Sequence, residues 1–187
     1  QYTSNFTPPT APLSHTGSGT SLLMNNKSDA NIYDAASSSH IRFTGDTVTN
    51  NSTRKFTTSS SVYFDDGTNG LHISTPVDAS TGPLSQSELF TGDFTIEYWI
   101  YPTAWYANDA FMGYGWYAGQ QGSFALYTIS GSTVALYASS TGSSWNLKSG
   151  VTAFSTWTNS WKHFAMTYDV SADSLVFYLD GVVQSTH

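Results

Sequence analysis

The sequence predicts an all-β fold, a two-sheet antiparallel sandwich or jelly roll, on three observations. Its 187 residues include 12 Tyr, 11 Phe and 6 Trp but only 10% charged residues, a composition that suits pleated, half-buried sheets. Short runs of alternating apolar and polar residues recur at spacings of roughly 10 residues, separated by Gly- and Ser-rich turns. No stretch keeps a helical period for more than about two turns.

The expected strands follow in chain order, and most are short. Two weak strands at 31–34 and 40–44 precede a pair at 62–64 and 71–73, which flank a turn rich in Gly, Asn and Asp. The longest alternating run covers 94–101. Further strands are predicted at 111–117, 124–129, 134–138, 161–169 and 174–179, with another candidate at 144–148 and one short helical turn at 85–90.

Asp180 and Gly181 predict a two-residue hairpin after the last of these strands. A type I′ turn needs positive φ at both central positions, and Asp-Gly satisfies that need at low cost. Only residues 182–187 follow this turn, so we expect the sandwich to lack its last strands, as in a fragment of a longer polypeptide.

Residues 1 to about 60 differ from the rest of the chain. Residues 5–13 are proline-rich and should be extended, and residues 14–20 have the composition of a linker. The segment has too few apolar residues to build its own core. We therefore expect residues 1–55 to form an extended N-terminal arm and residues 56–187 to form the sandwich.

Composition and charge also limit the classes of binding partner that we expect. The net charge is −7, from 13 acidic and 6 basic residues, and the basic residues are too scattered to neutralise a phosphate backbone. Nucleic-acid binding is not expected. Membrane insertion is not expected either, because no apolar run approaches the ~20 residues of a spanning helix. Without cysteine there can be neither a disulfide nor a thiolate metal site.

Two motifs carry a family resemblance. Residues 92–99 read G-D-F-T-I-E-x-W, and residues 161–181 contain W-x-H-x-A-x-T-Y-D followed by L-x-x-Y-x-D-G. In this order they resemble the laminin-G-like, concanavalin-A-like jelly-roll family. The resemblance covers roughly residues 61–183 and implies the jelly-roll fold, a fold that hosts many functions.

Some members of this family are glucanases, so the chain can be compared with their catalytic motif. The retaining glucanases of this fold resemble one another in an E-x-D-x-x-E run on one strand, whereas this chain has only Glu88 and Glu97, neither in such a run. Asp93 and Glu97, four residues apart on a strand, would lie roughly 13 Å apart, too far for a catalytic carboxylate pair. There is no G-x-S-x-G elbow either. The sequence predicts a protein that is not an enzyme.

Glycan binding is predicted from aromatic residues next to amide and carboxyl side chains near turns. Sugar rings stack on flat aromatic rings while polar neighbours bind the hydroxyls. The alternative for each tryptophan is packing at the rim of the sandwich. The candidates are Trp105, Tyr106, Asn108, Asp109, Trp116, Tyr117, Gln120 and Trp145.

Calcium is the one metal that the sequence suggests, because hard cations prefer oxygen ligands in flexible loops. Asp and Asn are also ordinary turn residues, so the same pattern arises without a metal. The candidate ligands are Asp65, Asp66, Asn69, Asp169 and Asp173.

The leading hypothesis is a structural or adhesion module on the surface of a virus particle, packed against other copies or other virion proteins and in contact with host glycans. It rests on a second resemblance: the opening T-P-P-T-A-P-L and G-T-S-L-L segments are similar to virion structural proteins of marine tailed phages. The alternative is a secreted or cell-surface bacterial lectin-like carbohydrate-binding module. An atypical polysaccharide hydrolase is a third.

Overall fold

The computed structural model describes residues 2–14, 19–20, 22–26, 32–34, 36, 40–65, 70–74, 90–114, 124–141 and 144–187. Over these ranges the chain forms strands and turns, and it contains no helix long and apolar enough to cross a membrane. The chain divides into two compact units. Gln1–Pro8 with Gln86–His187 form one, the sandwich unit, and Pro9–Ser85 form the other, the small-sheet unit.

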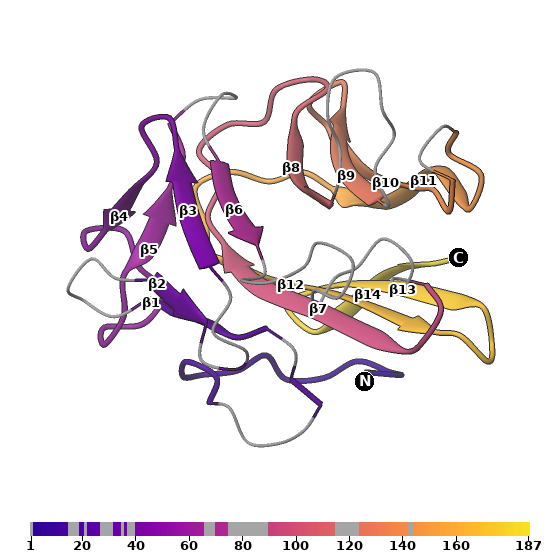
Figure 1. The fold of residues 1–187 in the computed structure, drawn as a ribbon, viewed down its shortest axis with the longest axis horizontal. Coiled ribbons are helices and arrows are strands. Elements are labelled where there is room, and N and C mark those ends of the chain that lie inside the picture. The colour runs from indigo at the N-terminus through magenta and orange to yellow at the C-terminus, as the bar shows by residue number, and fades with distance from the viewer. Residues whose placement is uncertain are drawn as a thin grey trace. The chain divides into compact units, whose positions relative to one another are not determined.

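The sandwich unit is built from two four-stranded antiparallel sheets that lie face to face (Figure 1). Sheet I has the order β11–β10–β9–β8, and sheet II has the order β14–β13–β12–β7. The strands of sheet I are β8 (Ala110–Tyr114), β9 (Phe124–Ile129), β10 (Thr133–Ala138) and β11 (Lys148–Ser155). Those of sheet II are β7 (Phe94–Ile100), β12 (Lys162–Asp169), β13 (Ser174–Leu179) and β14 (Val182–Thr186). The sequence-based prediction of an all-β, two-sheet antiparallel sandwich is confirmed.

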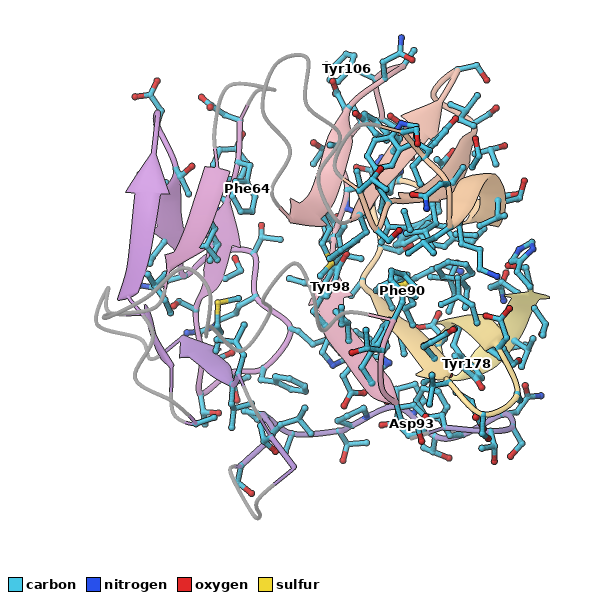
Figure 2. All side chains as sticks on the ribbon, turned by 45° about the vertical axis from the view of Figure 1, so that its right-hand side comes forward. Phe64, Phe90, Asp93, Tyr98, Tyr106 and Tyr178 are labelled. Atoms are coloured by element: carbon cyan, nitrogen blue, oxygen red, sulfur yellow. The ribbon has the colours of Figure 1, made fainter. Side chains whose placement is uncertain are left out.

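The hydrophobic core lies between the two sheets. Because side chains alternate along a strand, every second residue of β9, β10, β12 and β13 points inward, and each fully buried large side chain contributes about 1.5–3 kcal/mol. Figure 2 shows Phe90 and Tyr98 in the layer between the sheets, where both pack against this core. The fully buried members of the core include Phe124, Leu126, Val134, Leu136, Phe164, Met166, Leu175 and Phe177.

Strand β12 is buried on both of its faces. Phe164 and Met166 face the core, whereas His163, Ala165 and Thr167 lie on the outer face of sheet II and are still at most 2% exposed. Residues 2–8, which we call the strap, run along this outer face (Figure 1) and contact it through both backbone and side chains. The strap belongs to the sandwich unit although residues 9–85 separate it from that unit in sequence.

The last strand joins the two sheets at one edge of the sandwich. The Ser185 hydroxyl donates to the carbonyls of Thr152 and Ala153 on β11, at 2.8 and 2.9 Å. The His187 ring nitrogen lies 2.7 Å from the Thr152 carbonyl. These contacts satisfy backbone acceptors on an edge strand that would otherwise be open to pairing.

Two tight turns have the backbone that the hairpins need. Asp180 and Gly181 have φ of 51° and 75°, so the predicted type I′ geometry at this turn is confirmed. Ser130 and Gly131 repeat it between β9 and β10, with φ of 51° and 72°.

The described residues of the small-sheet unit form three two-stranded antiparallel sheets. Strand β3 (His40–Thr44) pairs with β6 (Gly70–Ser74), and β4 (Val48–Asn50) pairs with β5 (Ser61–Tyr63). Strand β1 (Met24–Asn26) pairs with β2 (Ile32–Asp34). The proposed boundary at residue 55, between arm and sandwich, stays a prediction.

The edge strand β11 of sheet I was not predicted from the sequence. The sequence suggested a strand at 144–148, but residues 144–147 form no strand, and β11 begins only at Lys148. The reason is local: β11 contains Gly150 at φ +67° and pairs with β10 through two register shifts. Bulges of this kind break the alternation that marks a strand in sequence. The predicted helical turn at 85–90 falls mostly outside the described residues.

Truncation of a buried core side chain should lower the stability of the protein strongly. We expect Phe177→Ala to lower the free energy of unfolding by about 3–5 kcal/mol, because the ring is fully buried and leaves a cavity. Urea denaturation followed by tryptophan fluorescence measures this. Val182→Ala, at a side chain that is 51% exposed, is the control and should change stability by less than about 0.5 kcal/mol. Equal effects of both changes would contradict the core as described.

Candidate functional site

The outer face of sheet I carries three neighbouring aromatic side chains, which we call the aromatic face: Tyr127, Tyr137 and Trp145. Tyr127 on β9 and Tyr137 on β10 point away from the core because they alternate with buried Leu126 and Leu136. Their ring centroids lie 5.6 Å apart in a T-shaped arrangement, and Trp145 follows at 5.7 Å from Tyr137. All three side chains are half-buried, so each ring is partly open to solvent.

Small residues make the floor of the aromatic face. Register pairs Ala125 with Tyr137 and Ala135 with Tyr127, so each tyrosine lies directly opposite an alanine. Gly113 pairs with Ala125 on the other side. A Cβ at Gly150 would lie 3.2 Å from the Tyr137 hydroxyl oxygen, so glycine leaves room for that ring. The result is a surface on which large flat rings stand beside alanine and glycine.

Burial and the nearby Tyr137 raise the pKa of Tyr127 to about 12. Its hydroxyl therefore stays protonated at neutral pH and can both donate and accept a hydrogen bond. The aromatic face thus offers ring surfaces for stacking and uncharged hydroxyls for hydrogen bonding.

The predicted cluster at 105–109 separates into structural and exposed residues. Trp105 packs against the core, its indole nitrogen donates to the Trp157 carbonyl, and the two rings lie 5.6 Å apart. The backbones of Asn108 and Asp109 bond to the end of β9, with Asn108 N donating to the Thr128 carbonyl at 2.8 Å. Trp105 is therefore a packing residue, and the backbones of Asn108 and Asp109 make structural hydrogen bonds.

Tyr106 is the most exposed aromatic residue of that cluster, at 67%. Figure 2 shows it projecting outward at the end of sheet I. The Asn108 side chain is also exposed. Glycan contact by Tyr106, Asn108 and Asp109 stays a prediction, and so does contact by Trp116, Tyr117 and Gln120, which lie outside the described residues.

Tyr127 and Tyr137 were missed by the sequence analysis, which named only Trp145 of the aromatic face. A signal was present: the triplet Ala-Leu-Tyr occurs at 125–127 and again at 135–137. On two adjacent strands, this repeat places each tyrosine on the face opposite to a core leucine.

The predicted calcium ligands act as turn residues where they are described. The Asp169 carboxylate accepts hydrogen bonds from Ser171 N at 2.9 Å and Ala172 N at 3.0 Å, and Asp173 accepts one from the Tyr168 hydroxyl at 2.8 Å. Asp65 is exposed, and Asp66 and Asn69 lie outside the described residues. Across the described part of the chain, no group of three or more His, Cys, Asp or Glu is placed to hold a metal ion. Calcium binding stays a prediction.

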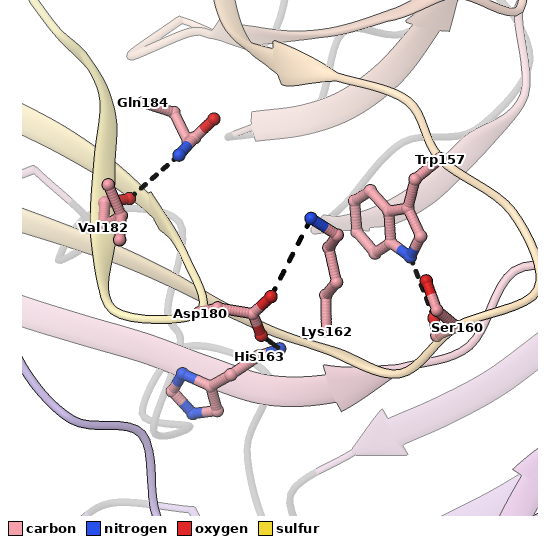
Figure 3. A network of polar contacts seen from close by, with 7 residues as sticks. All are labelled: Trp157, Ser160, Lys162, His163, Asp180, Val182 and Gln184. Atoms are coloured by element: carbon pink, nitrogen blue, oxygen red, sulfur yellow. Dashed lines mark hydrogen bonds and ion pairs between the residues drawn. The ribbon is translucent and has the colours of Figure 1, made fainter.

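A polar network ties the last hairpin to the strand before it (Figure 3). The Asp180 carboxylate accepts from His163 N at 2.9 Å, and its second oxygen lies 3.8 Å from Lys162 Nζ. Lys162 in turn lies over the Trp157 ring, 5.6 Å from its centroid. Trp157 is half-buried and packs against the core, and it is held by this network and by its indole nitrogen, which donates to the Ser160 carbonyl at 2.9 Å.

On the outer face of sheet II, Glu97 is bound from two sides. The Tyr2 hydroxyl donates to Glu97 Oε2 at 2.9 Å, and His163 Nε2 lies 3.3 Å from the same oxygen. Burial alone would raise the pKa of the Glu97 carboxyl, but hydrogen bonds from His163 and Tyr2 outweigh it, so the pKa lies below its ordinary value of 4.5. A carboxylate held ionised in this way is poorly suited to act as the general acid of a glycosidase.

The fold and the aromatic face together define a β-sandwich that has partly exposed aromatic rings on the outer face of one sheet. A family model described as the Concanavalin A-like lectin/glucanases superfamily matches residues 65–187, about two-thirds of the chain. The protein belongs to this superfamily. Neither curated proteins nor solved structures include a match to the chain. Because the superfamily joins lectins and glucanases, membership indicates a capacity to bind carbohydrate and leaves the individual function open.

The Glu97 cluster predicts a selective titration shift. The chain has only two glutamates, so carbon-13 labelling of glutamate carboxyls gives two NMR signals. Glu97 should titrate below 4.5, and Tyr2→Phe should move its pKa upward, because one of the two lowering hydrogen bonds is lost. The ionised carboxylate stabilises the fold above about pH 4.5, and this contribution is lost as pH falls through the lowered pKa.

The Glu88 signal serves as an internal reference, and Tyr63→Phe, at an exposed tyrosine of the small-sheet unit, is the matched control. A Glu97 titration that does not respond to Tyr2→Phe would show that the strap hydroxyl is not bonded to it.

Proposed function

We propose that this protein is a non-enzymatic carbohydrate-binding module carried on the surface of a virus particle, as a fibre, decoration or appendage protein. The single observation that carries carbohydrate binding is the aromatic face of sheet I. Membership of a superfamily that includes lectins supports it independently.

The chemistry of the aromatic face suits a neutral sugar chain. Sugar rings present C–H surfaces that stack on flat aromatic rings, and their hydroxyls pair with uncharged polar groups. Tyr127, Tyr137 and Trp145 supply both, because each of these rings is half-buried and so partly open to solvent. None of these side chains is charged at neutral pH, so we expect little preference for acidic sugars.

Two observations support a binding role over an enzymatic one. The aromatic face consists of tyrosine, tryptophan, alanine and glycine and lacks a carboxylate pair of the kind that glycoside hydrolysis needs. Glu97, on the other sheet, is engaged by the strap and by His163. Incubation with any glycan that binds should therefore release no new reducing ends.

The placement on a virus particle rests on sequence. It is supported by the resemblance of the N-terminal segments to virion structural proteins of marine tailed phages and by a composition low in charge and without cysteine. If the protein is part of a particle, the protease sites within residues 1–60 that are cleaved in the isolated protein should be protected in the intact particle. Cleavage at equal rates would favour a secreted bacterial lectin-like module.

Binding should depend on the aromatic face. On a glycan array we expect Tyr137→Ala and Trp145→Ala each to weaken binding at least tenfold, about 1.4 kcal/mol, because each change removes a stacking surface. Tyr106→Ala tests the exposed residue of the 105–109 cluster in the same assay. Repeating the array with a calcium chelator tests whether calcium contributes.

The matched control is Tyr63→Ala, which removes an exposed tyrosine of the small-sheet unit and should leave binding unchanged. Circular dichroism confirms that each variant is folded. Undiminished binding by folded Tyr137→Ala and Trp145→Ala would contradict the aromatic face as the site. An absence of binding by the wild-type protein to any glycan would leave a purely structural role.

A further inference from the structure

The strap occupies a specific binding surface on the outer face of sheet II. Tyr2 and Phe6 stack on each other with ring centroids 3.5 Å apart and planes within 5°. Phe6 then meets the rings of His163 and Tyr178 edge-on, at 5.8 and 5.3 Å. Figure 2 shows Tyr178 on this side of the sheet. The stacked pair covers a histidine that is only 1% exposed.

The backbone of the strap is also recognised. The Tyr2 carbonyl accepts hydrogen bonds from the Thr167 hydroxyl at 3.2 Å and the Tyr178 hydroxyl at 3.1 Å. Phe6 N donates to the Gly181 carbonyl at 2.9 Å. On the same hairpin, Val183 N donates to the Asn5 side-chain oxygen at 3.0 Å. With the bond from the Tyr2 hydroxyl to Glu97, three strap residues are bound by groups from β7, β12, β13 and the last hairpin.

Gly181 is shaped for this contact. A Cβ placed on Gly181 would collide with the backbone carbonyl of Phe6. The turn already favours glycine through its φ of 75°, but Asn tolerates such a φ as well. Only the absence of a side chain lets the strap pass over the hairpin.

We propose that this surface is a peptide-binding site whose ligand is the strap, and that it accepts the strap of a second copy of the chain in exchange for its own. The strap shares a compact unit with residues 86–187, yet residues 9–85 form another unit between them. An exchanged strap would make the same contacts as the resident one, which is the general reason that swapping an element costs little.

Local concentration decides which strap is bound. Within one chain the strap is tethered to its site and binding is intramolecular, so the resident strap is favoured in dilute solution. Where copies are held side by side at comparable local concentration, exchange links them without any new interface. This inference does not rest on carbohydrate binding and can fail or succeed separately from it.

Two complementary full-length variants test the exchange. The double variant Tyr2→Ala/Phe6→Ala has a defective strap and an intact site, and Gly181→Asn has an intact strap and a blocked site. Each alone should be monomeric, and an equimolar mixture should give a one-to-one complex in native mass spectrometry. A synthetic peptide of residues 1–10 should dissociate this complex, and the same peptide with Tyr2→Ala and Phe6→Ala should not.

Gly131→Asn is the matched control for Gly181→Asn, because Gly131 occupies the same turn position with φ +72° and its turn is not contacted by the strap. It should not complement the strap-defective variant. The exchange is overturned if the folded variants give no complex at millimolar total concentration, or if the complex also forms when Gly181→Asn carries Tyr2→Ala and Phe6→Ala.

A second measurement covers failure of Gly181→Asn to fold. The wild-type peptide of residues 1–10, carrying a fluorophore, is titrated into the Tyr2→Ala/Phe6→Ala variant. Saturable binding at least tenfold tighter than that of the doubly substituted peptide supports a site for the strap in trans. Equal binding of the two peptides contradicts it.

Discussion

The structure depends on the double burial of strand β12. Its core-facing residues pack against sheet I, and its outer residues lie under the strap, so that six consecutive residues from His163 to Tyr168 are buried. A strand between two packed layers has to satisfy polar groups on both sides. Thr167 does so through the Tyr2 carbonyl, and His163 does so at Nε2 through Glu97, whereas His163 Nδ1 is buried without a hydrogen-bond partner among the described residues. The strap is thus a third layer, and Glu97, His163 and Thr167 of the family motifs face that layer.

Much of the sandwich could be predicted from sequence because its strands obey one local rule. Strands 124–129 and 134–138 are short apolar runs between turns rich in Gly and Ser, and the Asp180-Gly181 turn has a backbone requirement that few residue pairs meet. Strand β11 does not follow the rule, since bulges beside Gly150 interrupt its alternation. The position of the strap could not be predicted at all. Its contacts join Tyr2 to Tyr178 across 176 positions, and composition alone marks residues 5–13 as extended without naming a partner.

The candidate site also contains residues that could be predicted from the sequence and residues that could not. Trp145 was named as a candidate for glycan contact because it is a tryptophan near a predicted turn. Trp105 has the same sequence context, but it packs against the core. Tyr127 and Tyr137 became candidates only when register placed them together with alanine opposite each ring. Composition gives the number of aromatic residues in the sandwich. The register of the strands decides which of these rings lie on the outer face.

The order of the strands also has a consequence for how the chain reaches this fold. Strands β8 to β11 each pair with a neighbour in sequence, but β7 must wait for β12, roughly 60 residues later. Such non-local pairing is slow to form. The strap waits longer still, because the hairpin over which it passes lies more than 170 positions after it in the chain. Until that hairpin has formed, the outer face of sheet II stays uncovered, and the strap is among the last segments of the sandwich unit to reach its place.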